Sequence, residues 1–354
     1  MGFKTKIQAA LVIGMLMALV FAFTALSLTG CSNPTGGGGG GPSGPIPKVY
    51  VAGSYNSKPC YWVNNVRVDL KVPEGAAGAE ANAITVASDG TVYVAGNYWE
   101  PFQPTRACYW KGDEIENDLA DSDYLIPESI TVASNGKVYV TIGKSYWEDG
   151  AKQPDFTPAG SQYVSTVTVA SDGSVYHAGR RDTGSAVYKA CYWKDRGSLV
   201  GLSSDPSSVS YIAVVDGVIY AQGSYNPGSG NKLCSWTGAQ QNPLEEPAGN
   251  DGVYIKAVTG AGGVAYVLGH YYDGPYDVPC YWKNDALKTL SLPAGAVVSK
   301  ANGIAVLDGV AFVAGDYGIY PDIKACYWVG GQPVKLPQPA GAITTSANGI
   351  YVKW

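Results

Sequence analysis

Short apolar runs in which side chains alternate in character recur along the chain from residue 49 onward. Val49-Tyr50-Val51-Ala52-Gly53 is the first of seven related runs, which end at Gly53, Gly96, Gly143, Gly179, Gly223, Gly269 and Gly315. Alternation with a period of two is the signal of β-strands. The runs repeat about every 44 residues, which is the period of a unit of several strands rather than of a single hairpin.

Each repeat contains four predicted strands. The first is an Ile-Thr-Val-like run, centred on Ile84, Ile130, Val167, Ile212, Val258, Ile304 and Ile350. An Asp-Gly or Asn-Gly pair joins it to the Val-Tyr-Val run in most repeats, which is a strong hairpin signal. A Cys-Tyr-Trp run and a weaker strand follow. In the third repeat this run reads Ser145-Tyr146-Trp147, and most of the loop before it is missing.

The two ends of the repeat region are complementary. The last residues, 347–354, form a first strand with no second strand after it, and Val49 opens a second strand with no first strand before it. Pairing of these strands closes a ring and leaves no open sheet edge. The sequence therefore predicts an all-β fold over residues 48–354, a seven-bladed β-propeller of four-stranded blades closed by its C-terminal strand.

One repeat carries a resemblance to a known family. The segment Ala81-Asn82-Ala83-Ile84-Thr85-Val86-Ala87-Ser88-Asp89-Gly90-Thr91-Val92-Tyr93-Val94-Ala95-Gly96-Asn97-Tyr98 resembles the bacterial β-propeller repeat called SBBP. The resemblance extends over the repeat rhythm of the whole region. It implies a propeller fold and is far less specific about function.

The N-terminal residues resemble a bacterial lipoprotein signal. Lys4 and Lys6 precede an apolar run from about Ala9 to Leu28, and Leu28-Thr29-Gly30-Cys31 resembles a lipobox. The resemblance implies a signal peptide over residues 1–30, a lipid on Cys31 and, because Ser32 follows, the outer membrane. Residues 31–47 are rich in Gly and Pro, which is typical of a flexible tether. An uncleaved membrane anchor over the apolar run is the alternative.

Composition and charge argue against nucleic-acid binding. Charged residues make up 15% of the chain, the net charge is −5, and acids and bases are scattered. No basic surface for nucleic acid is indicated. We expect a monomer that contacts the membrane through its lipid and holds no cofactor.

The pattern of the repeated cysteines and tryptophans is typical of core residues. Six cysteines occupy equivalent positions, so we expect buried free thiols rather than disulfides. The tryptophans recur in every blade and predict a structural ring. With no Cys-x-x-Cys pair, and only His177 and His270 as histidines, no metal site is expected. His177 lies inside a predicted strand, where packing is the expected role.

Aromatic residues recur two positions after the glycine of the Val-Tyr-Val run. They are Tyr55, Tyr98, Tyr225, Tyr271 and Tyr317, with Trp99 and His270 beside them. The longer second–third and fourth–first connections share one face, so these residues form either a partly exposed collar that binds a glycan or protein, or caps on the blade edges.

A second ring lies two residues before the central Ile or Val of each first strand. It consists of Asn82, Glu128, Ser165, Ser210, Lys256, Asn302 and Asn348. If the first strand is innermost, these residues line one mouth of the central channel. The asparagines can satisfy backbone groups there, whereas Glu128 and Lys256 break the pattern and hint at a ligand.

Enzyme signatures are sparse: there is no Gly-x-Ser-x-Gly elbow and no phosphate loop. The sequence thus favours a lipid-anchored binding or scaffold module of the cell envelope, with a glycan or protein partner on the long-loop face. The rival is a polysaccharide lyase or hydrolase that uses Glu128, Lys256 and His270 at the channel mouth. A structural envelope protein without a discrete ligand is the third hypothesis.

Overall fold

The structure, a computed structural model, describes residues 46–119, 122–159, 162–184, 187–247, 252–274 and 276–354. The predicted signal peptide, the lipidation site Cys31 and the tether up to residue 45 lie outside these ranges. Among the described residues, no helix is long and apolar enough to cross a membrane.

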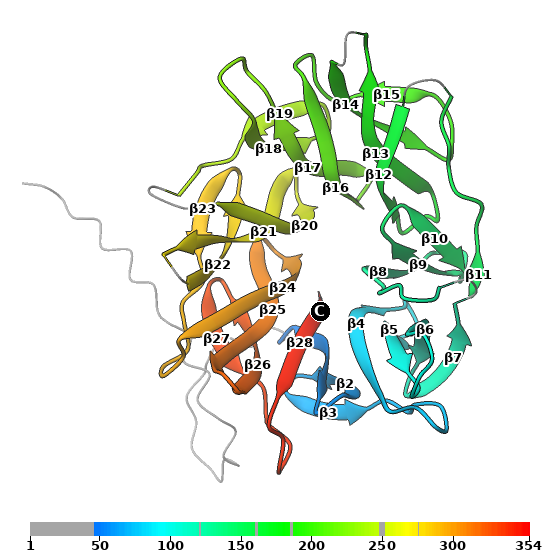
Figure 1. The fold of residues 1–354 in the computed structure, drawn as a ribbon, viewed down its shortest axis with the longest axis vertical. Coiled ribbons are helices and arrows are strands. Elements are labelled where there is room, and N and C mark those ends of the chain that lie inside the picture. Colours follow the sequence, from blue (N-terminus) through cyan, green and yellow to red (C-terminus); the bar gives the residue numbers. More distant parts are fainter. Residues whose placement is uncertain (1–45, 120–121, 160–161, 185–186, 248–251, 275) are drawn as a thin grey trace, which may run out of the picture. The chain divides into compact units, whose positions relative to one another are not determined.

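Within the described residues, 28 strands form seven four-stranded antiparallel sheets arranged in a ring (Figure 1). The predicted first strands lie nearest the centre of the ring, and the predicted fourth strands lie at its rim. The all-β, seven-bladed prediction is confirmed. We number the blades from the one that contains β1.

The strands fall into four classes, each of which has one member in every blade. In blade order, the innermost strands are β28 (Thr345–Lys353), β4 (Gly78–Val86), β8 (Ser129–Val132), β12 (Gln162–Val169), β16 (Ser207–Val215), β20 (Val253–Ala261) and β24 (Val298–Leu307). The second strands are β1 (Lys48–Tyr55), β5 (Val92–Trp99), β9 (Val138–Ile142), β13 (Val175–Asp182), β17 (Val218–Tyr225), β21 (Val264–Asp273) and β25 (Val310–Ile319). The third strands are β2 (Lys58–Val63), β6 (Arg106–Lys111), β10 (Ser145–Glu148), β14 (Tyr188–Lys194), β18 (Lys232–Thr237), β22 (Tyr276–Lys283) and β26 (Asp322–Val329). The rim strands are β3 (Val66–Asp69), β7 (Glu114–Asp118), β11 (Ala151–Lys152), β15 (Leu199–Gly201), β19 (Gln240–Pro243), β23 (Ala286–Thr289) and β27 (Gln332–Lys335).

The ring is closed by pairing between the two ends of the repeat region. β28 pairs antiparallel with β1, from Lys353 opposite Lys48 to Thr345 opposite Tyr55. The C-terminal strand thus becomes the innermost strand of the blade that the N-terminal strand begins. The predicted closure is confirmed.

Tight turns define one face of the ring, which we call the short-turn face. At the β4–β5 turn, Gly90 has a φ of +90°, and the carboxylate of Asp89 accepts the backbone N–H of Thr91 at 2.8 Å. Such turns join first to second strands because glycine adopts positive φ without steric cost.

The opposite face, the long-loop face, carries the second–third and fourth–first connections. The prediction that second–third connections are long is wrong for blades one and seven, where they are only two residues, Asn56-Ser57 and Tyr320-Pro321. The equally short connection of blade three, Gly143-Lys144, agrees with the loop loss expected from the sequence. In blades one and seven the second strands, β1 and β25, have eight and ten residues, so these blades still extend to the long-loop face.

The repeated cysteines and tryptophans form the core between blades, as predicted. The seven repeat tryptophans are at most 2% exposed, and the six repeat cysteines are buried free thiols. Burial raises the pKa of the Cys280 thiol to about 12, so it stays protonated and packs as a small apolar group. The indole N–H of Trp110 donates to the backbone carbonyl of Lys71 in the preceding blade, and Trp282 and Trp328 repeat this contact with Glu245 and Ser291. Each such bond fastens one blade to the next.

His177 is the polar exception in this core. It lies on β13 and pairs with Trp193 of β14; the residue that pairs with the repeat tryptophan in blades one to three is a valine. The side chain is 1% exposed, packs against Phe156 and Tyr146, and neither ring nitrogen has a hydrogen-bond partner among the described residues. Burial lowers the pKa of His177 from 6.5 to about 4. The predicted packing role is confirmed.

We expect His177 to make the fold sensitive to acid. The unfolded imidazole takes up a proton near pH 6.5 and the folded one only near pH 4, so stability is lost as the pH falls through this window. The full loss is on the order of 3 kcal/mol. Chemical denaturation of wild type and His177→Val between pH 4 and 7 measures it: the variant should lose this pH dependence. Equal pH slopes for both proteins would contradict the assignment.

Candidate functional site

The second predicted ring coincides with a β-bulge in each innermost strand except that of blade three. In the other six blades the pairing register shifts at the ring residue, as at Asn82 between Ala81 and Ala83. The ring residue is the fourth or fifth of a strand of eight to ten residues, so it lies on the channel wall and not at its mouth. The predicted placement at the mouth needs this correction.

The bulge explains the glycine that ends the Val-Tyr-Val run in six of the seven blades. A Cβ on Gly96 would lie 2.0 Å from the backbone oxygen of Glu80, and one on Gly53 would lie 1.9 Å from that of Ser346. Only glycine allows the bulged strand to approach so closely. Gly143 of blade three meets nothing within 4 Å, which agrees with the absence of a bulge there.

On one side of the channel, asparagines in the bulges bond neighbouring blades together. The side-chain amide of Asn302 donates to the backbone oxygen of Ala347 at 3.0 Å, and that of Asn348 donates to Ala81 at 2.9 Å. Both acceptors directly precede the ring residue of the next blade. These asparagines therefore satisfy backbone groups and hold the inner strands together, which was the structural alternative for this ring.

Blade three interrupts this arrangement. β8 has four residues, and its ladder ends where the N–H of Glu128 donates to Thr141 at 2.9 Å, because Pro127 has no N–H to extend it. β9 has only five residues and ends at Ile142, where the turn to β10 begins. Asn82 of blade two, which has no bulge to meet, bonds instead to Asn97 of its own blade at 2.7 Å. The strands of blade three therefore end earlier toward the long-loop face than those of its neighbours, and we call it the low blade.

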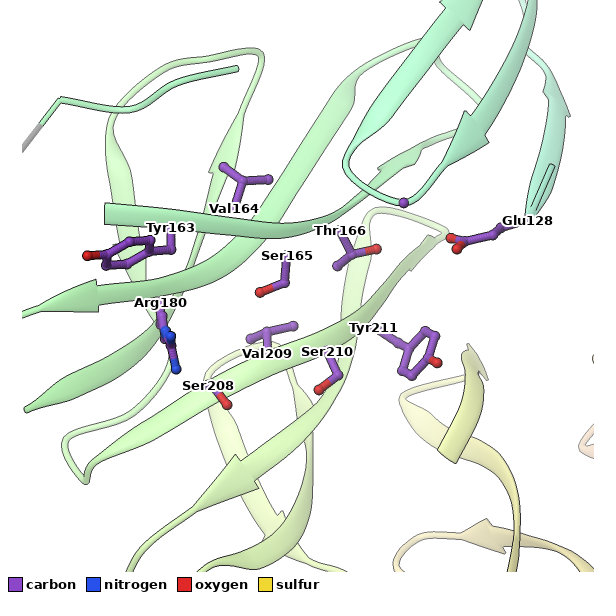
Figure 2. A pocket seen from close by; sticks show the side chains of 11 residues that line it. Glu128, Tyr163, Val164, Ser165, Thr166, Arg180, Ser208, Val209, Ser210 and Tyr211 are labelled. Atoms are coloured by element: carbon purple, nitrogen blue, oxygen red, sulfur yellow. The ribbon is translucent and has the colours of Figure 1, made fainter. Parts of the chain in front are cut away.

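A cavity of about 550 Å³ opens beside this low blade, on the channel wall of blades three to five. We call it the inner cavity. Glu128 lies on one side of it near Tyr211, and Tyr163 and Arg180 lie on the other (Figure 2). Between them are hydroxyls of Ser165, Ser208 and Ser210. Ser165 and Ser210 are the ring residues of blades four and five, both exposed, and neither has a hydrogen-bond partner among the described residues.

Glu128 is the acidic group of the inner cavity. It is open to the channel, yet the surrounding protein raises the pKa of its carboxyl, and a hydrogen bond from the backbone N–H of Gly143 offsets part of this rise. Burial, and then the charge of Glu128, raise the pKa of the Tyr211 phenol. The pair combines an acid that protonates more readily than usual with a neutral hydroxyl.

A second cavity of about 240 Å³, the outer cavity, lies between blades four and five. Tyr188, Tyr225, Asn226 and Asn231 contribute to its walls. Arg180 and Ser208 line both cavities. The two cavities together form what we call the groove, which runs from the channel wall outward between blades four and five.

The rival catalytic set is not brought together. Glu128 belongs to blade three, whereas Lys256 and His270 belong to blade six, with at least two blades between them in either direction around the ring (Figure 1). The Nζ of Lys256 donates to Asn302 at 2.9 Å, and burial lowers the pKa of this lysine. His270 stacks on Tyr254 with ring centroids 5.3 Å apart.

The same side of the channel contains Asp316, which no repeat motif marks. Its carboxylate accepts the side-chain amide of Asn302 at 3.1 Å and the backbone N–H of Ala347 at 2.8 Å. Burial raises the pKa of Asp316 to about 6. Lys256 of blade six and Asp316 of blade seven are thus both bonded to Asn302, and Asp316 is bonded to the backbone as well.

The predicted aromatic collar divides into buried and accessible members. Tyr98 and Tyr317 are 3% and 7% exposed, so for these two residues the collar hypothesis is wrong and the alternative of caps on the blade edges holds. The hydroxyl of Tyr98 donates to Asp118 at the end of the rim strand, and that of Tyr55 donates likewise to Asp69. These residues cap blade edges.

The remaining members are half-buried. Trp99 covers Gly78, Tyr271 packs on the core of its blade, and Tyr225 lines the outer cavity. Of the residues singled out from the sequence, Glu128, Ser165 and Ser210 of the second ring and Tyr225 of the collar therefore line the groove. The prediction missed Tyr163, Arg180 and Tyr211, because they occupy positions that no repeat motif marks. Pro127 before Glu128 and the shortened loop of blade three were the signals that could have led to them.

No protein-family model matches the sequence, and the search of curated proteins found no similar protein. Among solved structures, similar chains include the propeller domain of the trilobed protease from Pyrococcus furiosus (12% identity, 82% of this chain, 92% of that chain, TM-score 0.49). An ulvan lyase from a new polysaccharide lyase family (11%, 80%, 84%, 0.46) and a xyloglucanase from Xanthomonas campestris (15%, 84%, 52%, 0.45) are also similar. No ligand or activity of this chain follows from these likenesses.

Proposed function

We propose that the protein is a binding module whose groove, on the channel wall of blades three to five, holds a glycan. The observation that carries the proposal is the contrast between the two sides of the channel. The asparagines of blades seven and one are used in bonds between blades, whereas Ser165 and Ser210 present free hydroxyls to the inner cavity.

The chemistry of the groove suits a sugar. Sugar rings have hydroxyls that bond to serine and asparagine side chains, and apolar faces that stack on aromatic rings. Ser208 and Asn226 supply such polar groups, and Tyr163, 49% exposed, supplies an accessible ring. A groove open to the long-loop face also admits a chain longer than one sugar.

The anchor proposed from the sequence is compatible with this site. β1 begins with Lys48 at the short-turn face, and the groove opens on the other face. A lipid on Cys31 and a tether over residues 31–47 would hold the propeller at the outer membrane of a bacterial envelope. The likeness of the repeats to SBBP sequences supports the bacterial setting.

Filling the inner cavity tests the proposal. Ser210→Trp places an indole where we expect the sugar, at an exposed position, so the fold should be retained. We expect wild type to be retarded by one or more polysaccharides of a neutral and acidic panel in native affinity gels, and Ser210→Trp not to be. The matched control is Ser88→Trp, at an exposed serine of the short-turn face.

A second pair of variants tests the aromatic contact. Tyr163 and Tyr254 occupy equivalent positions in blades four and six, opposite Arg180 and His270. Tyr163→Ala should weaken retardation, and Tyr254→Ala should leave it unchanged. An equal loss of retardation in Tyr163→Ala and Tyr254→Ala would exclude the groove as the binding site. Unchanged retardation in both Tyr163→Ala and Ser210→Trp would exclude it as well.

The Glu128–Tyr211 pair favours polysaccharide cleavage, by a lyase or hydrolase, as the second candidate. An acid with a raised pKa beside a hydroxyl can exchange protons with a bound sugar. If the groove is catalytic, Glu128→Gln should abolish formation of new chain ends from a retained polysaccharide and still bind it. Binding without any new chain ends in wild type would leave the module non-catalytic.

A further inference from the structure

Arg180 occupies the middle of the groove in an unusual setting. It follows Gly179 on β13 and is exposed. The centre of its guanidinium lies 4.3 Å from the ring centroid of Tyr188 and 5.5 Å from that of Tyr163. The two tyrosine rings meet edge to face with centroids 5.9 Å apart. The rings thus hold the cation in place through cation–π attraction.

No carboxylate of the described residues lies within ion-pair distance of Arg180. Arg67 in blade one makes a useful comparison. Its guanidinium lies 4.5 Å from the ring centroid of Tyr55, and its Nε bonds to the carboxylate of Asp69 at 2.7 Å. Arg180 has the aromatic contacts alone, and its N–H groups bond to no carboxylate of the described residues.

The guanidinium of Arg180, unpaired among the described residues, faces the groove. Arg180 lines both cavities, beside Ser208, whose hydroxyl lies 3.3 Å from that of Ser224. A guanidinium offers a planar fork of N–H donors that suits the two oxygens of a carboxylate or sulfate. Because the ring contacts restrict its orientation, less conformational freedom is lost when an anion binds.

We infer that the groove takes a negatively charged glycan and that Arg180 binds the carboxylate or sulfate group of one of its sugars. The inference rests on the proposed function and names the class of its ligand. Tyr163 supplies the stacking surface beside that group, and the serines of the groove bond to its hydroxyls. In a protein of net charge −5, this single cation determines which glycans are accepted.

Paired probes test the inference. Dextran sulfate is compared with dextran, and polygalacturonate with its methyl ester, so each pair shares a sugar backbone and only one member carries anionic groups. We expect the purified protein to bind at least one charged probe, measured by biolayer interferometry, and its neutral counterpart at least about tenfold more weakly. Which charged probe binds distinguishes sulfate from carboxylate.

Variants assign the effect to Arg180. Arg180→Gln should weaken binding of the charged probe about tenfold, and Arg180→Lys should restore part of it, since lysine keeps the charge and loses the fork. Lys189→Gln is the charge-matched control, at a neighbouring residue that lines neither cavity, and should bind as wild type does.

The outcomes separate the anionic class of the ligand from the glycan site itself. If neutral and charged probes bind equally, Ser210→Trp abolishes binding and Arg180→Gln has no effect, the anionic class is wrong and the glycan site stands. If Lys189→Gln loses as much affinity as Arg180→Gln, the attraction is general and the inference is overturned. If no probe binds, the inference and the proposed function both fail.

Discussion

The pairing of β28 with β1 is the constraint on which the rest of the structure depends. It joins the two ends of a chain of blades, and the same strand carries Asn348, whose amide bonds blade one to the carbonyl of Ala81 in blade two. Asn302 makes the preceding link, to Ala347 of β28 itself. Closure fixes every inner strand relative to its neighbours. A single short blade therefore creates a depression in a rigid frame and does not open the ring.

Blade three supplies that depression through ordinary backbone chemistry. Pro127 ends the ladder of β8 because it has no N–H, and β9 has only five residues because the turn that begins at Gly143 comes early in this blade. Without a bulge in this blade, the contact that Asn302 and Asn348 make elsewhere is replaced by a bond within blade two. The ring residues of the next two blades are serines, whose side chains are too short to reach across. The ring residues of blades seven and one bond neighbouring blades together, whereas those of blades four and five are left accessible to a ligand.

The fold could be predicted because its determinants repeat. In six of the seven blades the Val-Tyr-Val run carries the glycine that the bulge requires, and in the same six blades the third strand supplies a buried Cys–Trp pair. The site could be predicted only in part. Glu128 was visible as a break in the pattern of its ring. For Tyr98 the sequence left exposed collar and blade-edge cap open, because its partner, Asp118, lies on a weakly marked strand. Arg180 and Tyr163 lie together only because β12 and β13 pair. No local motif encodes that contact.

Hydrogen exchange tests the central claim, that blade three opens a binding groove, most directly. Backbone amide exchange is compared in the free protein and in the protein saturated with a polysaccharide that it retains. The account predicts slower exchange in the ligand complex for β12, β16 and the turn at Gly143, with blades six, seven and one unchanged. Protection confined to β20, β24 and β28 would contradict it and move the site to the side of the channel where asparagines bond the blades together.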